Sequence, residues 1–239
     1  AASQEGVIDF SAIKDNEDLE VADYLPSDIN DMEKICTEDY SVNLVDMADN
    51  TEDNKTVNDN PNDAKAISLG TQVYDTVATE LEQRWYAFSV AKATKFTAAM
   101  VMDDTADFDL YVYKLNETDG TLELVGGSAI VGAGTQELSM LKLDEGIYFI
   151  GIEAATGNGS FLMYTYAGVN DGKEINDTTD LASSYVRNSR MTATIDSPFD
   201  YDYYKVVISK NDILEYTFDQ PTGCDYKVLV YDGKNYYTI

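Results

Sequence analysis

Apolar and polar residues alternate along most of the chain after about residue 72. Short runs such as Phe108–Tyr113 and Ile147–Ile152 present one inward and one outward face, which is typical of β-strands. Gly- and Asn-rich turns separate such runs, and helical patterns are scarce after residue 60. The sequence therefore predicts an all-β fold, a sandwich of the jelly-roll kind. Its expected strands are Gln72–Val77, Arg84–Ala91, Thr94–Met102, Phe108–Lys114, Thr121–Val125, Glu137–Leu141, Ile147–Ala154 and Ser160–Tyr166.

Residues 1–57 follow a different pattern. Val7–Phe10 and Tyr40–Leu44 alternate like short strands, and residues 27–36 space their apolar side chains like one short helix. Polar residues crowd together without a period over residues 46–59, as in a flexible connection. We therefore predict an acidic N-terminal segment over residues 1–57, with short strands and room for one short helix.

The remaining sequence contains a repeat, which indicates two homologous domains. The domains are predicted over residues 58–168 and 172–239, each a β-sandwich. The matching pairs keep their order at offsets of 114, 118 and 118: Asn60–Asp63 with Glu174–Asp177, Trp85–Phe88 with Tyr203–Val206, and Leu110–Tyr113 with Val228–Tyr231.

The second copy is shorter than the first. The first copy continues from Tyr113 to residue 168, whereas the sequence stops at Ile239, soon after the equivalent Tyr231. About three C-terminal strands are therefore missing, and a sandwich cut at this point would expose an unpaired edge. Either the natural chain continues, or strands from residues 1–50 complete the second sandwich. Donation within the chain gives a monomer, whereas donation to a neighbour gives a polymer.

The composition excludes several functions. The 239 residues include 16 basic and 44 acidic side chains, a net charge of −28, and no histidine. Histidine-dependent nucleophiles and zinc sites are thereby excluded, and nucleic acid and anionic membranes are poor partners. No apolar run is long enough for a membrane span, so membrane insertion is not expected. The start at Ala1-Ala2-Ser3 resembles the remnant of a cleaved signal peptide, which predicts an exported, extracellular or cell-surface protein.

Three motifs of the repeat resemble the bacterial pre-peptidase C-terminal domain, a β-sandwich found beside secreted proteases and in the collagen-binding domains of collagenases. The second copy has the opening Glu174–Asp177 motif and the Asp-rich turn Asp200–Tyr204, and the first copy has the strand Asp107–Tyr113. The resemblance extends over both copies of the repeat. It implies an accessory or binding module, two copies of which are present here.

The resemblance also implies a calcium site in each copy, because members of this family bind calcium through the opening motif and the Asp-rich turn. In the second copy the ligands would be Glu174, Asn176, Asp177, Asp200 and Asp202. Carboxylate and amide oxygens of this kind suit calcium. An acid expected further upstream is Gly172 here, and the alternative is that the Asn-Asp pair caps a turn. A weaker site in the first copy would use Asn60, Asn62, Asp63, Glu80 and Glu82.

Two further features need an interpretation. Cys36 and Cys224 are the two cysteines, and we expect them to form a disulfide bond in an exported protein. Eighteen tyrosines are best explained by packing within the sheets, and exposed ones suit the binding of sugars or peptides.

No arrangement of residues suits catalysis, so no catalytic residue is predicted. One more acidic group is expected to be a solvated loop: Asp103, Asp104, Asp107 and Asp109. The sequence therefore predicts a non-enzymatic exported module that binds an extracellular protein or polysaccharide. The alternatives are a self-assembling subunit of an extracellular fibre, which binds copies of itself, and the accessory region of a secreted hydrolase.

Overall fold

The computed structural model describes residues 2–9, 40–42, 57–168, 172–209 and 213–238. The chain is almost entirely β-structure, with a single 3₁₀ turn, η1 (Pro61–Asp63), in the described ranges. In the described ranges, no helix has the length and apolar character needed to cross a membrane. The chain divides into two units, which are described separately: Ser27–Ser183 with Asn188–Tyr204, and Ala1–Pro26 with Ser184–Arg187 and Lys205–Ile239.

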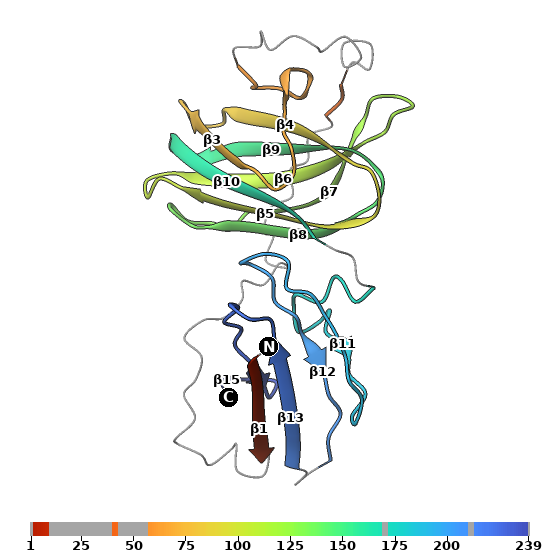
Figure 1. The fold of residues 1–239 in the computed structure, drawn as a ribbon. Coiled ribbons are helices and arrows are strands. Elements are labelled where there is room, and N and C mark those ends of the chain that lie inside the picture. The colour runs from red at the N-terminus through yellow and green to blue at the C-terminus, as the bar shows by residue number, and fades with distance from the viewer. Residues whose placement is uncertain (1, 10–39, 43–56, 169–171, 210–212, 239) are drawn as a thin grey trace. The chain divides into compact units, whose positions relative to one another are not determined.

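The first of these units contains a β-sandwich of two sheets (Figure 1). The four-stranded sheet has the order β3-β10-β5-β8, and the five-stranded sheet has the order β2-β4-β9-β6-β7. The strands are β2 (Lys65–Ala66), β3 (Gln72–Val77), β4 (Gln83–Val90), β5 (Thr94–Met102), β6 (Asp107–Leu115), β7 (Leu122–Ser128), β8 (Glu137–Leu143), β9 (Gly146–Thr156) and β10 (Gly159–Gly168). All eight strands predicted for this copy are confirmed, as is the all-β fold class.

The core lies between the two sheets, where each strand presents alternate side chains. Phe88, Phe96, Phe108, Ile150 and Phe161 are among its buried members. The rings of Phe88 and Phe96 stack with centroids 4.9 Å apart. Burial of these large side chains, at about 25 cal/mol per Å² of apolar surface, is the main source of the stability of this unit.

The outer face of the five-stranded sheet carries a second apolar cluster around Trp85. The segment Tyr40–Val42 covers it: the Tyr40 ring lies 4.7 Å from that of Trp85, and Val42 is buried. Ser41 forms an isolated antiparallel bridge with Thr121 at the edge of β7. The strand-like run predicted at Tyr40–Leu44 therefore lies on the first sandwich. Residues 43 and 44, and the helix predicted over residues 27–36, lie outside the described residues.

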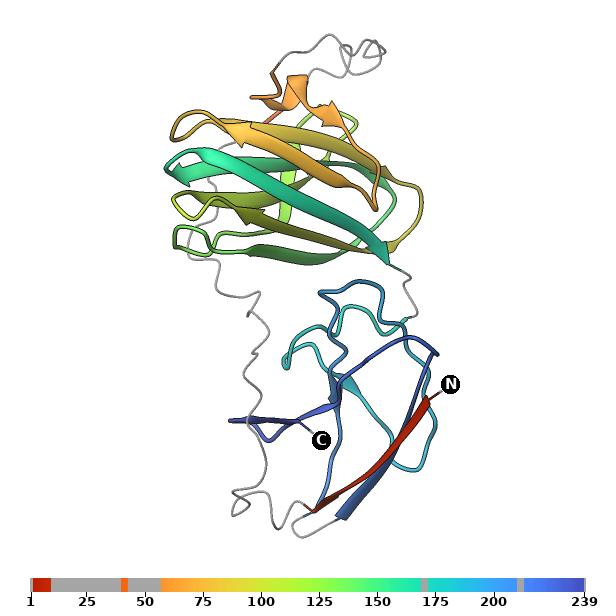
Figure 2. The same ribbon diagram turned by 60° about the vertical axis from the view of Figure 1, so that its left-hand side comes forward.

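The second copy contains shorter strands, paired two by two. β11 pairs with β12, and β14 pairs with β15. The N-terminal strand β1 pairs with β13 along its whole length, from Ala2 opposite Gln220 to Asp9 opposite Ile213 (Figure 2). A strand from the N-terminal segment thus joins the second copy of the same chain. The bounds are β1 (Ala2–Asp9), β11 (Ser183–Ser184), β12 (Tyr204–Lys205), β13 (Ile213–Gln220), β14 (Leu229–Tyr231) and β15 (Tyr236–Thr238).

The hydrogen bonds of the opening motif correct the alignment of the two copies. The Trp85 amide donates to the Asn58 carbonyl at 2.7 Å, and the Tyr203 amide donates to the Asn176 carbonyl at 2.8 Å. Each asparagine also donates through Nδ2 to the carbonyl of the same aromatic residue. Asn58 and Asp59 are therefore the counterparts of Asn176 and Asp177, at the offset of 118 that the other two motifs have. The offset of 114 assigned to the opening motif was wrong, because a second Asn-Asp pair follows shortly after the first.

Candidate functional site

The residues predicted to bind calcium in the second copy come together around a lysine from the first. We call Glu174, Asp177, Asp200 and Asp202 the acid cluster. One carboxylate oxygen from each of Glu174, Asp200 and Asp202 lies within 4.8 Å of the others. Lys95, near the start of β5, is fully buried beside these acids.

Three carboxylates surround the Lys95 ammonium. Its Nζ lies 2.6 Å from Asp200 Oδ1, 2.8 Å from Asp177 Oδ1 and 3.2 Å from Glu174 Oε2. An ammonium has three N–H donors; hydrogen bonds join it to Asp177 and Asp200, and the Glu174 carboxylate adds an ion pair. Removing one partner of such a buried ion pair leaves an uncompensated charge, and such losses cost about 3–5 kcal/mol.

The charges of the acid cluster exceed the charge of Lys95. Burial raises the pKa of the Glu174 carboxyl to about 7 and of the Asp177 carboxyl to about 6, against the opposing effect of Lys95. Burial also raises the pKa of Asp202, with a further contribution from Asp200. Burial alone would lower the pKa of Lys95, but its bonds to Asp177 and Asp200 hold it above its usual value. The four carboxyl groups face a single ammonium, so a further cation would be attracted to the site when these groups are ionised.

Several buried oxygens of the site are also available to a cation. Asn176 Oδ1, Asp177 Oδ2 and Asp202 Oδ1 have no hydrogen-bond partner among the described residues. Asn176 and Asp177 are 0% and 1% exposed, so water does not readily replace the missing partners. Calcium takes six to eight oxygen ligands, and the carboxylate and amide oxygens of the second copy are of the type that it binds. Calcium itself remains a proposal.

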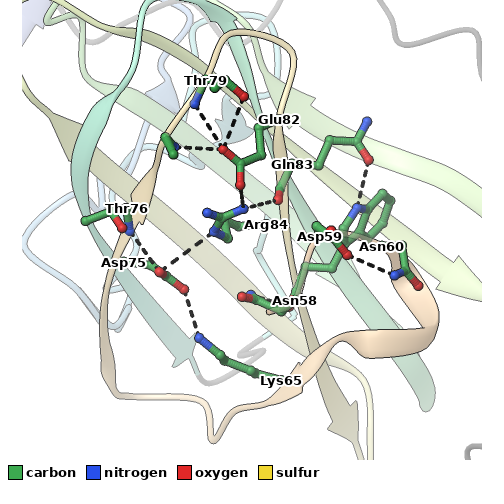
Figure 3. Close-up of polar contacts among 12 residues, drawn as sticks. Asn58, Asp59, Asn60, Lys65, Asp75, Thr76, Thr79, Glu82, Gln83 and Arg84 are labelled. Carbon is green, nitrogen blue, oxygen red and sulfur yellow. Dashed lines mark hydrogen bonds and ion pairs between the residues drawn. The ribbon is translucent and has the colours of Figure 1, made fainter. Parts of the chain in front are cut away.

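Residues of the weaker site predicted in the first copy bond to one another and to their neighbours; Figure 3 shows Asn60 and Glu82 among them. Asn60 caps η1, since its Oδ1 accepts from the Asn62 amide at 3.0 Å and its Nδ2 donates to Asp63 Oδ2 at 2.6 Å. Glu82 pairs with the Arg84 guanidinium at 2.7 Å, and Glu80 is exposed in the turn between β3 and β4. Asn60 and its neighbours therefore cap a turn, which was the alternative to calcium binding.

Arg84 explains why the first copy differs from the second. At the corrected offset of 118, Arg84 corresponds to Asp202 and Glu82 to Asp200. Arg84 is 7% exposed, and its guanidinium also lies 3.8 Å from Asp75. In the first copy, Arg84 thus stands where the second copy has Asp202, and it neutralises Glu82. The residues of the first copy therefore do not fit a calcium ion.

Sequence patterns did not indicate Lys95 as part of a site. Two of its partners, Asp177 and Asp200, are 82 and 105 positions away in the chain, and a single lysine in a strand carries no motif. The sequence signal that could have indicated Lys95 was its position near the start of a strand, Thr94–Met102, that has few other polar residues.

Cys224 is half-buried and forms no disulfide bond with another described residue. Cys36 lies outside the described residues. The disulfide bond between them therefore stays a prediction.

A second group of buried acids lies within the first sandwich. Glu137 is fully buried and accepts from the Ile130 amide at 3.1 and 3.2 Å. Asp107 and Asp109 are buried in β6, so the prediction that they lie in a solvated loop was wrong. Burial raises the pKa of Glu137 to about 7, and the charges of Asp109 and Asp107 add to this effect.

This raised pKa predicts that the first sandwich loses stability as the pH rises. The folded pKa of Glu137 is about 7 against its ordinary value of 4.5, so the folded state holds its proton more tightly. The contribution of the protonated Glu137 carboxyl to the unfolding free energy is complete below pH 4.5 and is lost as the pH rises past 7. We expect Glu137→Gln to raise the unfolding free energy by up to about 3 kcal/mol at pH 8, relative to its effect at pH 4.5.

Urea unfolding at both pH values measures this effect. Glu123→Gln, which changes an exposed glutamate of β7, is the control and should show no such pH dependence. An effect of Glu137→Gln that is equal at pH 4.5 and pH 8 would contradict the assignment.

Comparisons with known proteins give no family assignment. No family model matches the chain, and no curated protein matches it. Among solved structures, the pre-peptidase C-terminal domain of a Bacillus anthracis collagenase is similar at 16% identity, covering 43% of this chain and 93% of that one, with a TM-score of 0.37. PliG of Aeromonas hydrophila, a periplasmic inhibitor of g-type lysozyme, is similar at 13% identity over 44% of this chain and 95% of that one, TM-score 0.33. A β-1,3-glucan-binding module of Bacillus halodurans is similar at 8% identity over 44% and 99%, TM-score 0.29. All three similarities are weak, so the function proposed below rests on this chain's own residues.

Proposed function

We propose that this chain is a non-enzymatic, exported binding module of the pre-peptidase C-terminal kind, which holds an extracellular protein or polysaccharide on the outer face of its four-stranded sheet. The supporting observation is a stripe formed by Tyr74, Leu162 and Val101. Tyr74 of β3 lies opposite Leu162 of β10, which lies opposite Val101 of β5. Residues directly opposite one another share a face of the sheet, so the three side chains form one row.

Two members of the Tyr74 stripe are exposed to solvent. Tyr74 is 71% exposed and Val101 is 43% exposed, although both lie within strands. The other end of the same face is covered, because Phe199 packs against Ala99, Leu138 and Met140. Contiguous exposed apolar surface marks interaction sites on many proteins.

The chemistry of the stripe indicates the kind of ligand. The stripe has no charged side chain, on a chain with a net charge of −28. An aromatic ring beside aliphatic side chains suits apolar groups of a protein, and the ring alone also suits the face of a sugar. The neutral stripe therefore favours an uncharged extracellular ligand over a basic one.

Binding assays on immobilised matrix proteins and cell-wall polysaccharides test the proposal. We expect Tyr74→Ala to weaken retention about tenfold or more on a surface that holds the wild-type chain, as for an aromatic residue central to an interface. Val131→Ala is the matched control, since Val131 is 75% exposed in the loop between β7 and β8. Equal retention of Tyr74→Ala and wild type would exclude this face.

Calcium is proposed for the second copy alone. Glu174, Asp200 and Asp202 would hold the ion, with Asn176 within reach of Asp202. When bound, calcium would neutralise the excess negative charge of the acid cluster. It would stabilise the fold to the extent that the unfolded chain does not bind it.

Self-assembly is a second candidate function, for which the ladder between β1 and β13 supplies a geometry. All of β1 pairs with a strand near the other end of the chain. The same ladder formed between neighbouring chains would link them head to tail, as in strand donation.

A further inference from the structure

The Lys95 ammonium occupies the place of a cation within the acid cluster. It lies 2.6 to 3.2 Å from oxygens of three of the four carboxylates. Two of those acids, Glu174 and Asp200, also belong to the group that could hold a metal ion. A calcium ion would need these oxygens at about 2.3–2.6 Å. An ammonium and a calcium ion cannot share them without strong repulsion, because both are positive and the site is buried.

A basic side chain also neutralises the acids of the first copy. Arg84, at the position equivalent to Asp202, pairs with Glu82 and approaches Asp75 (Figure 3). The acids of each copy thus meet a buried basic side chain, and both of these side chains come from the first copy. The second copy has no basic residue at the position equivalent to Lys95, which is Ile213.

We propose that Lys95 is a built-in counter-cation of the acid cluster, and that a divalent cation enters the second copy only in competition with it. The inference rests on the calcium site proposed above. Its consequence is that the wild-type site is assembled without metal, with weak affinity for calcium.

Replacement of Lys95 by methionine tests the proposal. Methionine keeps a long, flexible side chain and removes the charge. Calcium chloride is titrated into the wild-type chain and the Lys95→Met variant, and binding is followed by calorimetry and by the thermal midpoint. We expect the variant to bind calcium at least tenfold more tightly than wild type. Its midpoint should fall in EDTA and recover in calcium, whereas the wild-type midpoint should change little in EDTA.

A matched control separates this effect from a general loss of charge. Lys142 of β8 lies directly opposite Lys95 in the ladder, but its side chain is exposed. Lys142→Met should bind calcium as weakly as wild type does.

The outcomes distinguish the two proposals. Equal and tight calcium binding by wild type and Lys95→Met would overturn competition with Lys95 while supporting the calcium site. Failure of both chains to bind calcium would overturn the calcium site and the inference with it. If Lys95→Met does not fold, NMR of the wild-type lysine ammonium groups decides. Loss of the Lys95 resonance from its ion-paired position on saturation with calcium supports competition, and an unchanged resonance with bound calcium contradicts it.

Discussion

Removal of residues 1–9 is expected to unfold the strand pairing of the second copy and leave the first sandwich intact. β13 would lose its partner along its whole length, from Ile213 to Gln220. An unpaired strand exposes its backbone N–H and C=O groups and associates readily with other chains. We expect amide exchange in β13 to accelerate at least a hundredfold and the variant to aggregate.

Hydrogen–deuterium exchange measures this result, with the amides of β5 and β9 as an internal control. Gly6→Pro is a milder variant, since Gly6 lies opposite Tyr216 and proline removes one backbone donor. Added peptide of residues 1–12 should restore protection to the deleted chain. Unchanged exchange in β13 after the deletion would show that β1 does not complete the second copy.

Replacement of Trp85 by alanine is expected to cost the first sandwich about 3–5 kcal/mol of unfolding free energy. Trp85 is 1% exposed, and its ring lies 4.7 Å from that of Tyr40 and 5.4 Å from that of Tyr113. Its Nε1 donates to Gln83 Oε1 at 2.9 Å. The indole also covers Gly151 on the facing strand β9, where a Cβ would lie 3.1 Å from the ring.

Urea unfolding measures the loss, with Trp85→Phe as the conservative control. Trp85→Ala should also release Tyr40–Val42 from the sheet, which limited proteolysis would detect. A cost below about 1 kcal/mol would mean that the cluster on this face contributes little. The result bears on function, because coverage by Tyr40–Val42 is what distinguishes this outer face from the exposed Tyr74 stripe.

Local patterns in the sequence were sufficient for the first sandwich. Its strands are long and rich in apolar residues, as in β9, and several of its turns contain glycine. The second copy is harder to predict because its strands are short: β12 has two residues, where its counterpart β4 has eight. The partner of β13 comes from the other end of the chain, which periodicity within a window does not reveal.

The candidate site was predicted in part. The family resemblance nominated Glu174, Asp200 and Asp202, and the structure places carboxylate oxygens of these three acids close together. Lys95 was missed because ion pairs between residues so far apart in the chain have no local pattern. In the first copy, the choice of Asn60 over Asn58 was wrong because two Asn-Asp pairs compete, and only the hydrogen bonds to Trp85 identify the equivalent one.

The native mass of the chain tests the central claim most directly, namely that the molecule is a binding module whose N-terminal strand pairs within its own chain. Sedimentation equilibrium or native mass spectrometry should give a single species of 26.5 kDa across the micromolar range. A series of multiples of that mass that grows with concentration, and that disappears when residues 1–9 are removed, would contradict the claim and favour a fibre subunit.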